Sequence, residues 1–67
     1  MNVDKEKKNI ICKFDNKNQN LVMQNKIDKH TYNHNKRLIH RLYDERNNYT
    51  IQELLFELSY FISWKGC

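Results

Sequence analysis

The stretch TIQELLFELSYFISWKG, residues 50–66, is the part of this 67-residue chain richest in large apolar side chains and decides its fold. Thr50 and Glu53 have the T-x-x-E spacing of a capping box, in which the hydroxyl and the carboxylate bond to free N–H groups of a first helical turn. Gly66 is typical of the residue that ends a helix. The sequence therefore predicts a helix over residues 50–66.

This predicted helix is apolar on two faces. At about 100° per residue, one face collects six side chains: Ile51, Leu54, Leu55, Leu58, Phe61 and Ile62. The opposite face carries what we call the aromatic stripe, which consists of Phe56, Tyr60 and Trp64. A helix with two apolar faces must be covered twice. The stripe is either a second core face, covered from within the chain, or an interface, and Glu53 and Glu57 beside it favour the interface.

A second helical period precedes this stretch, over residues 31–47. Its apolar side chains share one side and are Tyr32, Leu38, Ile39, Leu42 and Tyr43. The polar side carries Asn33, Arg37, His40, Arg41 and Asp44. Asn47 and Asn48 tolerate the backbone of a tight break. We therefore expect the two helices to form an antiparallel hairpin.

The N-terminal third has a different pattern. Residues 1–8 mix charges with few apolar side chains and predict a flexible arm. Residues 9–14 (NIICKF) and 20–27 (NLVMQNKI) are rich in strand-forming types and flank the Asn-rich connection at 15–19, which indicates a β-hairpin. Strand alternation turns Ile10, Cys12 and Phe14 towards the helices and Ile11 with Lys13 away from them, so the Cys12 thiol should be buried. The register of residues 20–27 stays open.

The expected fold is thus α+β, with an N-terminal β-hairpin packed on the antiparallel helical hairpin (ββαα) in a single domain over residues 9–67. The alternative is an all-α helical hairpin, in which residues 20–30 extend the helix at 31–47.

Composition points to a chain that needs external support. A domain of 67 residues buries only about 60% of its unfolded surface, and the mean hydropathy of −0.98 is low. Two cysteines, no signal peptide and no long apolar run indicate a cytoplasmic protein with reduced thiols, no intrachain disulfide and no membrane contact. A partner subunit would then supply the missing stability. Ten Asn, nine Lys and six Ile suggest A/T-rich codons, as in a phage or mobile element.

The sequence offers little for catalysis or metal binding. His30 and His34 are four residues apart, but no C-x-x-C motif accompanies them, so we expect no metal site and no cofactor. The only glycine, at position 66, excludes a Gly-rich phosphate loop. We therefore expect a protein that is not an enzyme.

Two functions remain. The first is a small interaction protein, homodimeric through the helix at 50–66, that inhibits or adapts a larger protein. Its expected interface residues are Glu53, Phe56, Glu57, Tyr60 and Trp64. The alternative is a nucleic-acid-binding regulator of weak, salt-sensitive affinity, because the net charge is +4 and basic side chains gather on the helix at 31–47. Its expected anion contacts are His30, His34, Lys36, Arg37, His40 and Arg41.

Overall fold

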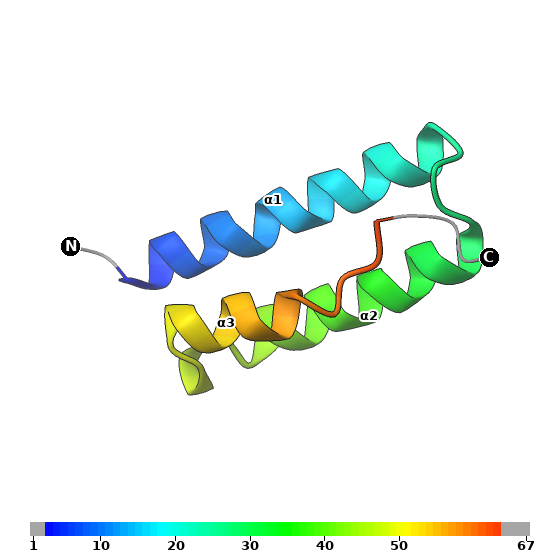
Figure 1. Ribbon diagram of the computed structural model, residues 1–67. Helices are drawn as coiled ribbons and strands as arrows, with labels where there is room; N and C mark the ends of the chain where they lie inside the picture. The colour runs from blue at the N-terminus through cyan, green and yellow to red at the C-terminus, as the bar shows by residue number, and fades with distance from the viewer. Residues whose placement is uncertain (1–2, 64–67) are drawn as a thin grey trace.

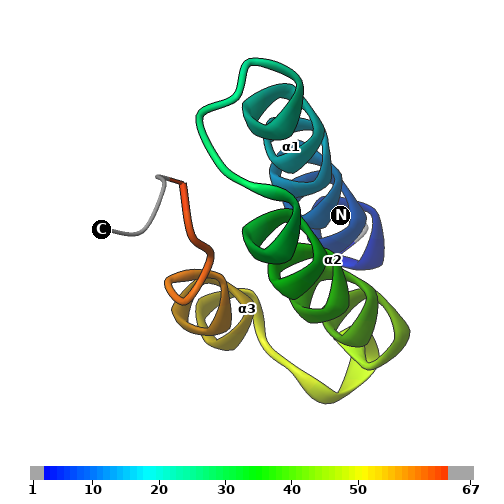
Figure 2. The same ribbon diagram turned by 90° about the vertical axis from the view of Figure 1, so that its right-hand side faces the viewer.

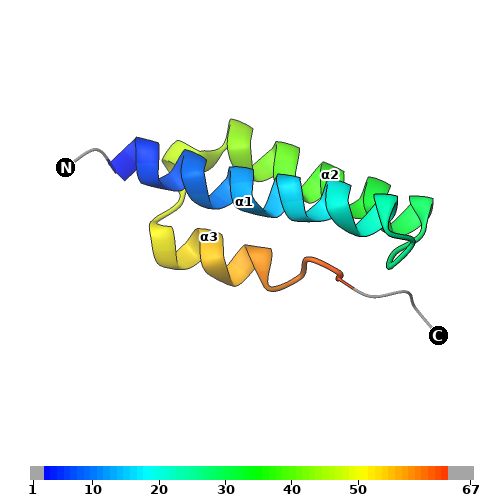
Figure 3. The same cartoon turned by 90° about the horizontal axis from the view of Figure 1, so that it is seen from above.

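The computed structural model describes residues 3–63, which form three α-helices and one short 3-10 helix (Figure 1). The elements are α1 (Val3–Met23), α2 (Lys29–Asp44), η1 (Arg46–Asn48) and α3 (Ile51–Leu58). α2 returns antiparallel along α1, and α3 returns antiparallel along α2 (Figures 1 and 3). The view down the helices shows α2 between α1 and α3 (Figure 2).

The predicted β-hairpin is wrong, because its residues form the body of α1 and residues 3–63 contain no strand. Ile11, Phe14, Asn18 and Leu21 recur at helical spacing and face the core, with Ile11 and Asn18 fully buried. An amphipathic helix would have an apolar residue at position 18, but the sequence has an asparagine there. The helical pattern is therefore hard to see in the sequence. The fold is therefore all-α rather than α+β.

The all-α alternative has the correct class but not the correct break. Asn25 ends α1 in the left-handed conformation (φ 60°). The Lys26 N–H donates to the Leu21 carbonyl at 2.9 Å and the Asn25 N–H to the Val22 carbonyl at 3.2 Å, the bonding pattern of a Schellman C-cap. Asp28 then caps α2 by accepting a hydrogen bond from the Thr31 N–H. Residues 20–30 are thus divided between two helices.

Residues 3–8, for which the sequence predicts a flexible arm, lie in the first turns of α1. The Asp4 carboxylate accepts a 2.8 Å hydrogen bond from Nε of Arg46, and the Lys7 ammonium donates to the Arg46 carbonyl at 3.1 Å. These contacts join the start of α1 to η1.

The core lies between the three helices and also takes Ile27 from the connection between α1 and α2 and Phe61 from the segment after α3. Its buried apolar members are Ile11, Leu21, Ile27, Leu38, Ile39, Leu42, Leu54, Leu58 and Phe61. Four expected core positions differ. Cys12 is an exposed thiol on α1 while Ile11 is buried, the reverse of the strand prediction. Leu55 is 49% exposed and Tyr43 is 39% exposed, since each lies at the edge of its helix's buried face.

The capping box at the start of α3 is confirmed, but the helix is shorter than predicted. The Glu53 N–H donates to Oγ1 of Thr50 at 3.1 Å, and the Thr50 N–H donates to Oε1 of Glu53 at 2.9 Å. α3 ends at Leu58, where the hydroxyl of Ser59 donates to the carbonyl of Phe56. The chain then turns, so that Phe61 enters the core. The predicted stop at Gly66 lies outside the described residues.

Two fully buried amides, which we call the asparagine clamp, hold the segment after α3. Oδ1 of Asn35 accepts from the Ile62 N–H at 2.9 Å, and its Nδ2 donates to the Ile62 carbonyl at 2.6 Å and to Oδ1 of Asn18 at 3.0 Å. Nδ2 of Asn18 donates to the Tyr32 carbonyl at 3.1 Å. Within residues 3–63, no buried side-chain polar atom lacks a partner. The clamp therefore ties α1, α2 and the segment 61–63 in one register.

Candidate functional site

A groove of about 640 Å³ lies between α2 and the C-terminal part of α3. α2 forms one wall with His34, Arg37 and Arg41, while Glu57 and Tyr60 form the other. Leu38 and Ile62 line it between these walls. The groove therefore combines an apolar lining with a rim of mostly basic side chains.

The groove brings together members of the two residue sets that the sequence predicts separately. His34, Arg37 and Arg41 belong to the anion set, and Glu57 and Tyr60 belong to the interface set. Nη2 of Arg41 donates to Oε1 of Glu57 at 2.9 Å. Arg37 is exposed and has no ion pair with any residue in 3–63. With His34 counted as neutral, two guanidinium groups face one carboxylate, which leaves the groove with one net positive charge.

Beside the groove, the described part of the aromatic stripe lies uncovered on α3 and on the turn that follows it. Phe56 is 63% exposed and Tyr60 is 59% exposed. Their ring centroids are 6.0 Å apart with an interplanar angle of 88°, an edge-to-face contact. Glu53 is also exposed, and its carboxylate is held by the capping box. Trp64, the third member of the stripe, lies outside the described residues.

The remaining basic residues of the anion set do not join the groove. Nζ of Lys36 donates to the Asp15 carboxylate at 2.7 Å, and this bond raises the pKa of Lys36 above its ordinary value of 10.5. His30 is exposed in the first turn of α2, where the carboxylate of Asp28 already accepts the Thr31 N–H. Lys36, Arg37 and His40 line a shallow hollow of about 310 Å³ on α2 together with Asn33, while His34 and Arg41 line the groove with Arg37. The anion set is therefore divided between two adjoining surfaces that meet at Arg37.

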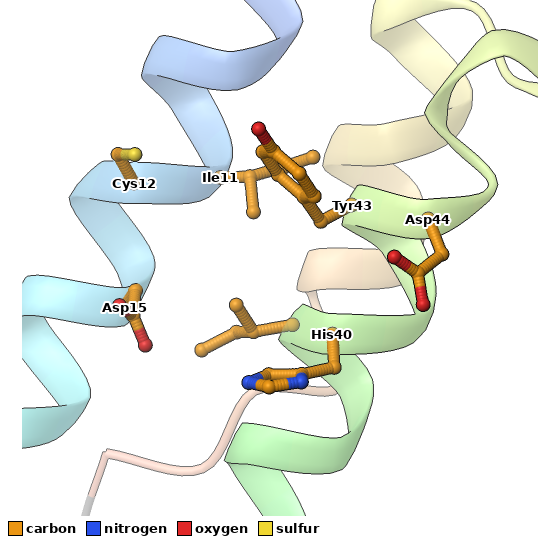
Figure 4. Close-up of a pocket in the computed structure, with 7 residues that line it drawn as sticks. Ile11, Cys12, Asp15, His40, Tyr43 and Asp44 are labelled. Atoms are coloured by element: carbon orange, nitrogen blue, oxygen red, sulfur yellow. The ribbon is translucent and has the colours of Figure 1, made fainter.

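His40 faces a second hollow of about 430 Å³ between α1 and α2 (Figure 4). The hollow is lined by Ile11, Cys12, Asp15, Ile39, His40, Tyr43 and Asp44. Figure 4 shows the Cys12 thiol and the His40 imidazole coming from facing helices and lying apart. A nucleophile needs a base within hydrogen-bonding reach, and this pair does not provide one.

Two searches of residues 3–63 gave negative results. No group of three or more His, Cys, Asp or Glu side chains is arranged to hold a metal ion. No helix in this part of the chain has both the length and the apolar content needed to cross a bilayer.

Sequence reasoning missed the groove's dependence on the asparagine clamp. Ile62 lines the groove because Asn35 holds its backbone on both sides, and Asn35 is in turn bonded to Asn18. The available signal was the position of the two asparagines, since each stands in the apolar phase of its helix. If such a segment forms a helix, a polar residue on its apolar face is buried and must be hydrogen-bonded.

Comparisons of the chain with protein-family models, with curated proteins and with solved structures found no match. The groove and the aromatic stripe beside it are therefore the features from which a function can be inferred.

Proposed function

We propose that this protein is a non-enzymatic, cytoplasmic protein-binding module that pairs with a second copy of itself through α3 and inhibits or adapts a larger protein. The observation that carries the proposal is the exposure of Phe56 on α3 and of Tyr60 in the turn just after it, with their rings in contact. Tyr, Phe and Arg are among the residue types that anchor protein interfaces, and Arg37 and Arg41 line the groove together with Tyr60.

Magnitudes favour pairing of two copies. The exposed parts of the two rings amount to roughly 200 Å², worth roughly 5 kcal/mol at about 25 cal/mol per Å². Association costs about 4–15 kcal/mol, so one copy of this surface is marginal by itself. A two-fold dimer buries the same surface twice. Self-association therefore roughly doubles the gain for a single association cost.

A nucleic-acid-binding function is the second candidate, because Arg37, His34 and His40 are exposed on α2 without a carboxylate partner among residues 3–63. Two neighbouring cations weaken it. Lys36 is bound to Asp15 and Arg41 to Glu57, so a phosphate at either cation would also approach a carboxylate. The remaining charge supports salt-sensitive, non-specific binding.

The test is affinity capture from lysate of the native cell, with and without nuclease, using wild-type protein and Phe56→Glu as baits. We expect one or more proteins, identified by mass spectrometry, to be captured by the wild type after nuclease treatment and lost with Phe56→Glu. Each captured protein is then purified and its binding to both baits is measured directly.

Met23→Glu is the matched control, because it makes the same kind of change at a side chain that is 77% exposed at the end of α1. It should capture the same proteins as the wild type. Capture that disappears with nuclease would favour the nucleic-acid function, and capture unchanged by Phe56→Glu would contradict a role for α3.

A further inference from the structure

We infer that, in the dimer proposed above, α3 of each copy lies along the groove of the other, and that Glu53 of one copy pairs with Arg37 of the second. The inference rests on the proposed self-association and adds its charge pairing and its direction.

The charges of α2 and α3 are complementary. α3, with the sequence IQELLFEL, contains two glutamates and no basic residue. The groove wall on α2 presents His34, Arg37 and Arg41 and no acidic residue. Within one copy, this complementarity is used once, in the bond between Arg41 and Glu57. Arg37 and Glu53 are left without an ion pair inside residues 3–63.

Helix geometry places these two side chains close together in an antiparallel dimer. A two-fold axis midway between Phe56 and Tyr60 sets each ring opposite the other type of ring in the second copy. Glu53 of that copy then lies about 7.5 Å from the axis along α3. Arg41 of the first copy is level with Glu57, to which it is bonded. Arg37 is about one turn away along α2, in the direction in which the antiparallel α3 ends. Arg37 therefore lies about 4.5 Å from the axis, on the same side of it as Glu53 of the second copy. The offset of about 3 Å is within the reach of an arginine side chain.

Glu53 can serve the capping box and the second copy together. Its Oε1 accepts the Thr50 N–H, and an ionised carboxylate has about four acceptor sites on two oxygens. Oε2 is therefore available to a guanidinium. The capping bond also fixes the rotamer of Glu53, which lowers the entropy lost on pairing.

A helix suits this groove better than other acidic ligands. One wall is the helix α2, and in the other both backbone groups of Ile62 are already bonded to Asn35, so few backbone groups are free to pair with an extended peptide. A docking helix satisfies its own backbone and needs only side-chain contacts. A nucleic-acid backbone would bring phosphates against the Glu57 carboxylate and would leave the apolar side chains of the groove uncovered.

A charge-exchange experiment tests the pairing. Sedimentation equilibrium is measured for the wild type, Arg37→Glu, Glu53→Lys and the double variant, and circular dichroism checks that each is folded. We expect each single variant to weaken dimerisation by about tenfold or more, because like charges then face each other at two symmetric places. The double variant should recover most of the wild-type affinity, since the two charges are exchanged.

Two controls isolate the charge pairing. Lys13→Glu makes the same charge change as Arg37→Glu at an exposed position of α1 and should leave dimerisation unchanged. Thr50→Ala weakens the cap that Glu53→Lys also disturbs, without reversing a charge, and should therefore leave the dimer stronger than Glu53→Lys does.

Three results would overturn the inference. If Arg37→Glu dimerises as strongly as the wild type, the charge pairing is contradicted, whereas self-association through the aromatic stripe is not. A folded double variant that stays monomeric would show that the two residues do not face each other. A wild type that is monomeric at high micromolar concentration would remove the dimer itself, while the capture experiment would still test binding to a larger protein.

Discussion

Asn35 makes three tertiary hydrogen bonds through one side chain, two to the backbone groups of Ile62 and one to Asn18. Removing it leaves several buried polar groups without partners. An unsatisfied buried group costs about 1–3 kcal/mol. Removing the Asn35 amide should therefore lower the free energy of unfolding by more than removing an amide on the surface.

We predict that Asn35→Ala lowers the free energy of unfolding by about 3 kcal/mol or more, measured by urea denaturation. Asn33→Ala is the matched control, because Asn33 is exposed on the same helix and should change stability by only about 0.5 kcal/mol. Equal effects at the two positions would contradict the clamp.

The contact between Asp4 and Arg46 predicts a pH dependence. The hydrogen bond from Arg46 lowers the pKa of Asp4 below its ordinary value of 3.8, and Lys8 adds to this effect. Because the folded-state pKa is the lower one, the contribution to stability is present above pH 3.8 and is lost as the pH falls through the folded-state pKa. We expect the stability difference between wild type and Asp4→Asn to be constant near neutral pH and to vanish in acid.

Chemical denaturation over a series of pH values measures this difference, and a carboxyl NMR titration reports the pKa of Asp4 directly. When Arg46 is replaced by Gln, the effect of Asp4→Asn on the free energy of unfolding should depend much less on pH. A difference that persists with Arg46 absent would assign the effect to another group.

Asn18 also explains why the first third of the chain misled the sequence prediction. Asparagine is common in turns, so a segment with Asn16, Asn18 and Asn20 suggests a loop between strands. Two of the three are exposed on α1, and the third is buried only because Asn35 supplies its partner from another helix. Local propensity does not contain that information.

At the scale of elements, α3 shows what a local signal can determine. Its start was predictable, since the capping box needs only residues 50–53. Its end was not, because Phe61 leaves the helical path to enter the core and Ile62 to meet Asn35. Tertiary contacts thus end the helix before its apolar pattern does.

We predict that Thr50→Ala lowers the free energy of unfolding by about 1 kcal/mol, because the Glu53 N–H loses its acceptor. Thr50→Ser keeps a hydroxyl at this position and should retain most of the stability. Thermal unfolding followed by circular dichroism compares the three proteins. An alanine variant as stable as the serine variant would mean that the cap contributes nothing measurable.

At the scale of the whole molecule, the groove could not be predicted as a site. Its walls come from residues 34–41 and 57–62, which approach each other only after α3 turns back along α2. The sequence did indicate most of the participating residue types, including Arg37, Arg41, Glu57 and Tyr60. It could not indicate that a cationic set and an aromatic set share one surface.

Dimer formation predicts that thermal stability depends on protein concentration. Association stabilises the folded state by mass action, so the Tm of the wild type should rise across a dilution series. Tyr60→Glu places a charge at the centre of the contact and should give a folded monomer with a lower Tm that is independent of concentration. Differential scanning calorimetry measures both.

Met23→Glu again serves as the control and should keep the concentration dependence of the wild type. A wild-type Tm that does not change over a wide concentration range would contradict self-association under these conditions.

The asparagine clamp has a consequence for the order in which the chain folds during synthesis. α1 and α2 leave the ribosome first, but Asn35 finds the N–H and carbonyl of Ile62 only after the segment behind α3 has emerged. Until then, the buried amide of Asn35 lacks two of its partners, at a cost of about 1–3 kcal/mol for each unpaired group. We therefore expect the pair of α1 and α2 to be less stable before residues 61–63 emerge than after they have bonded to Asn35.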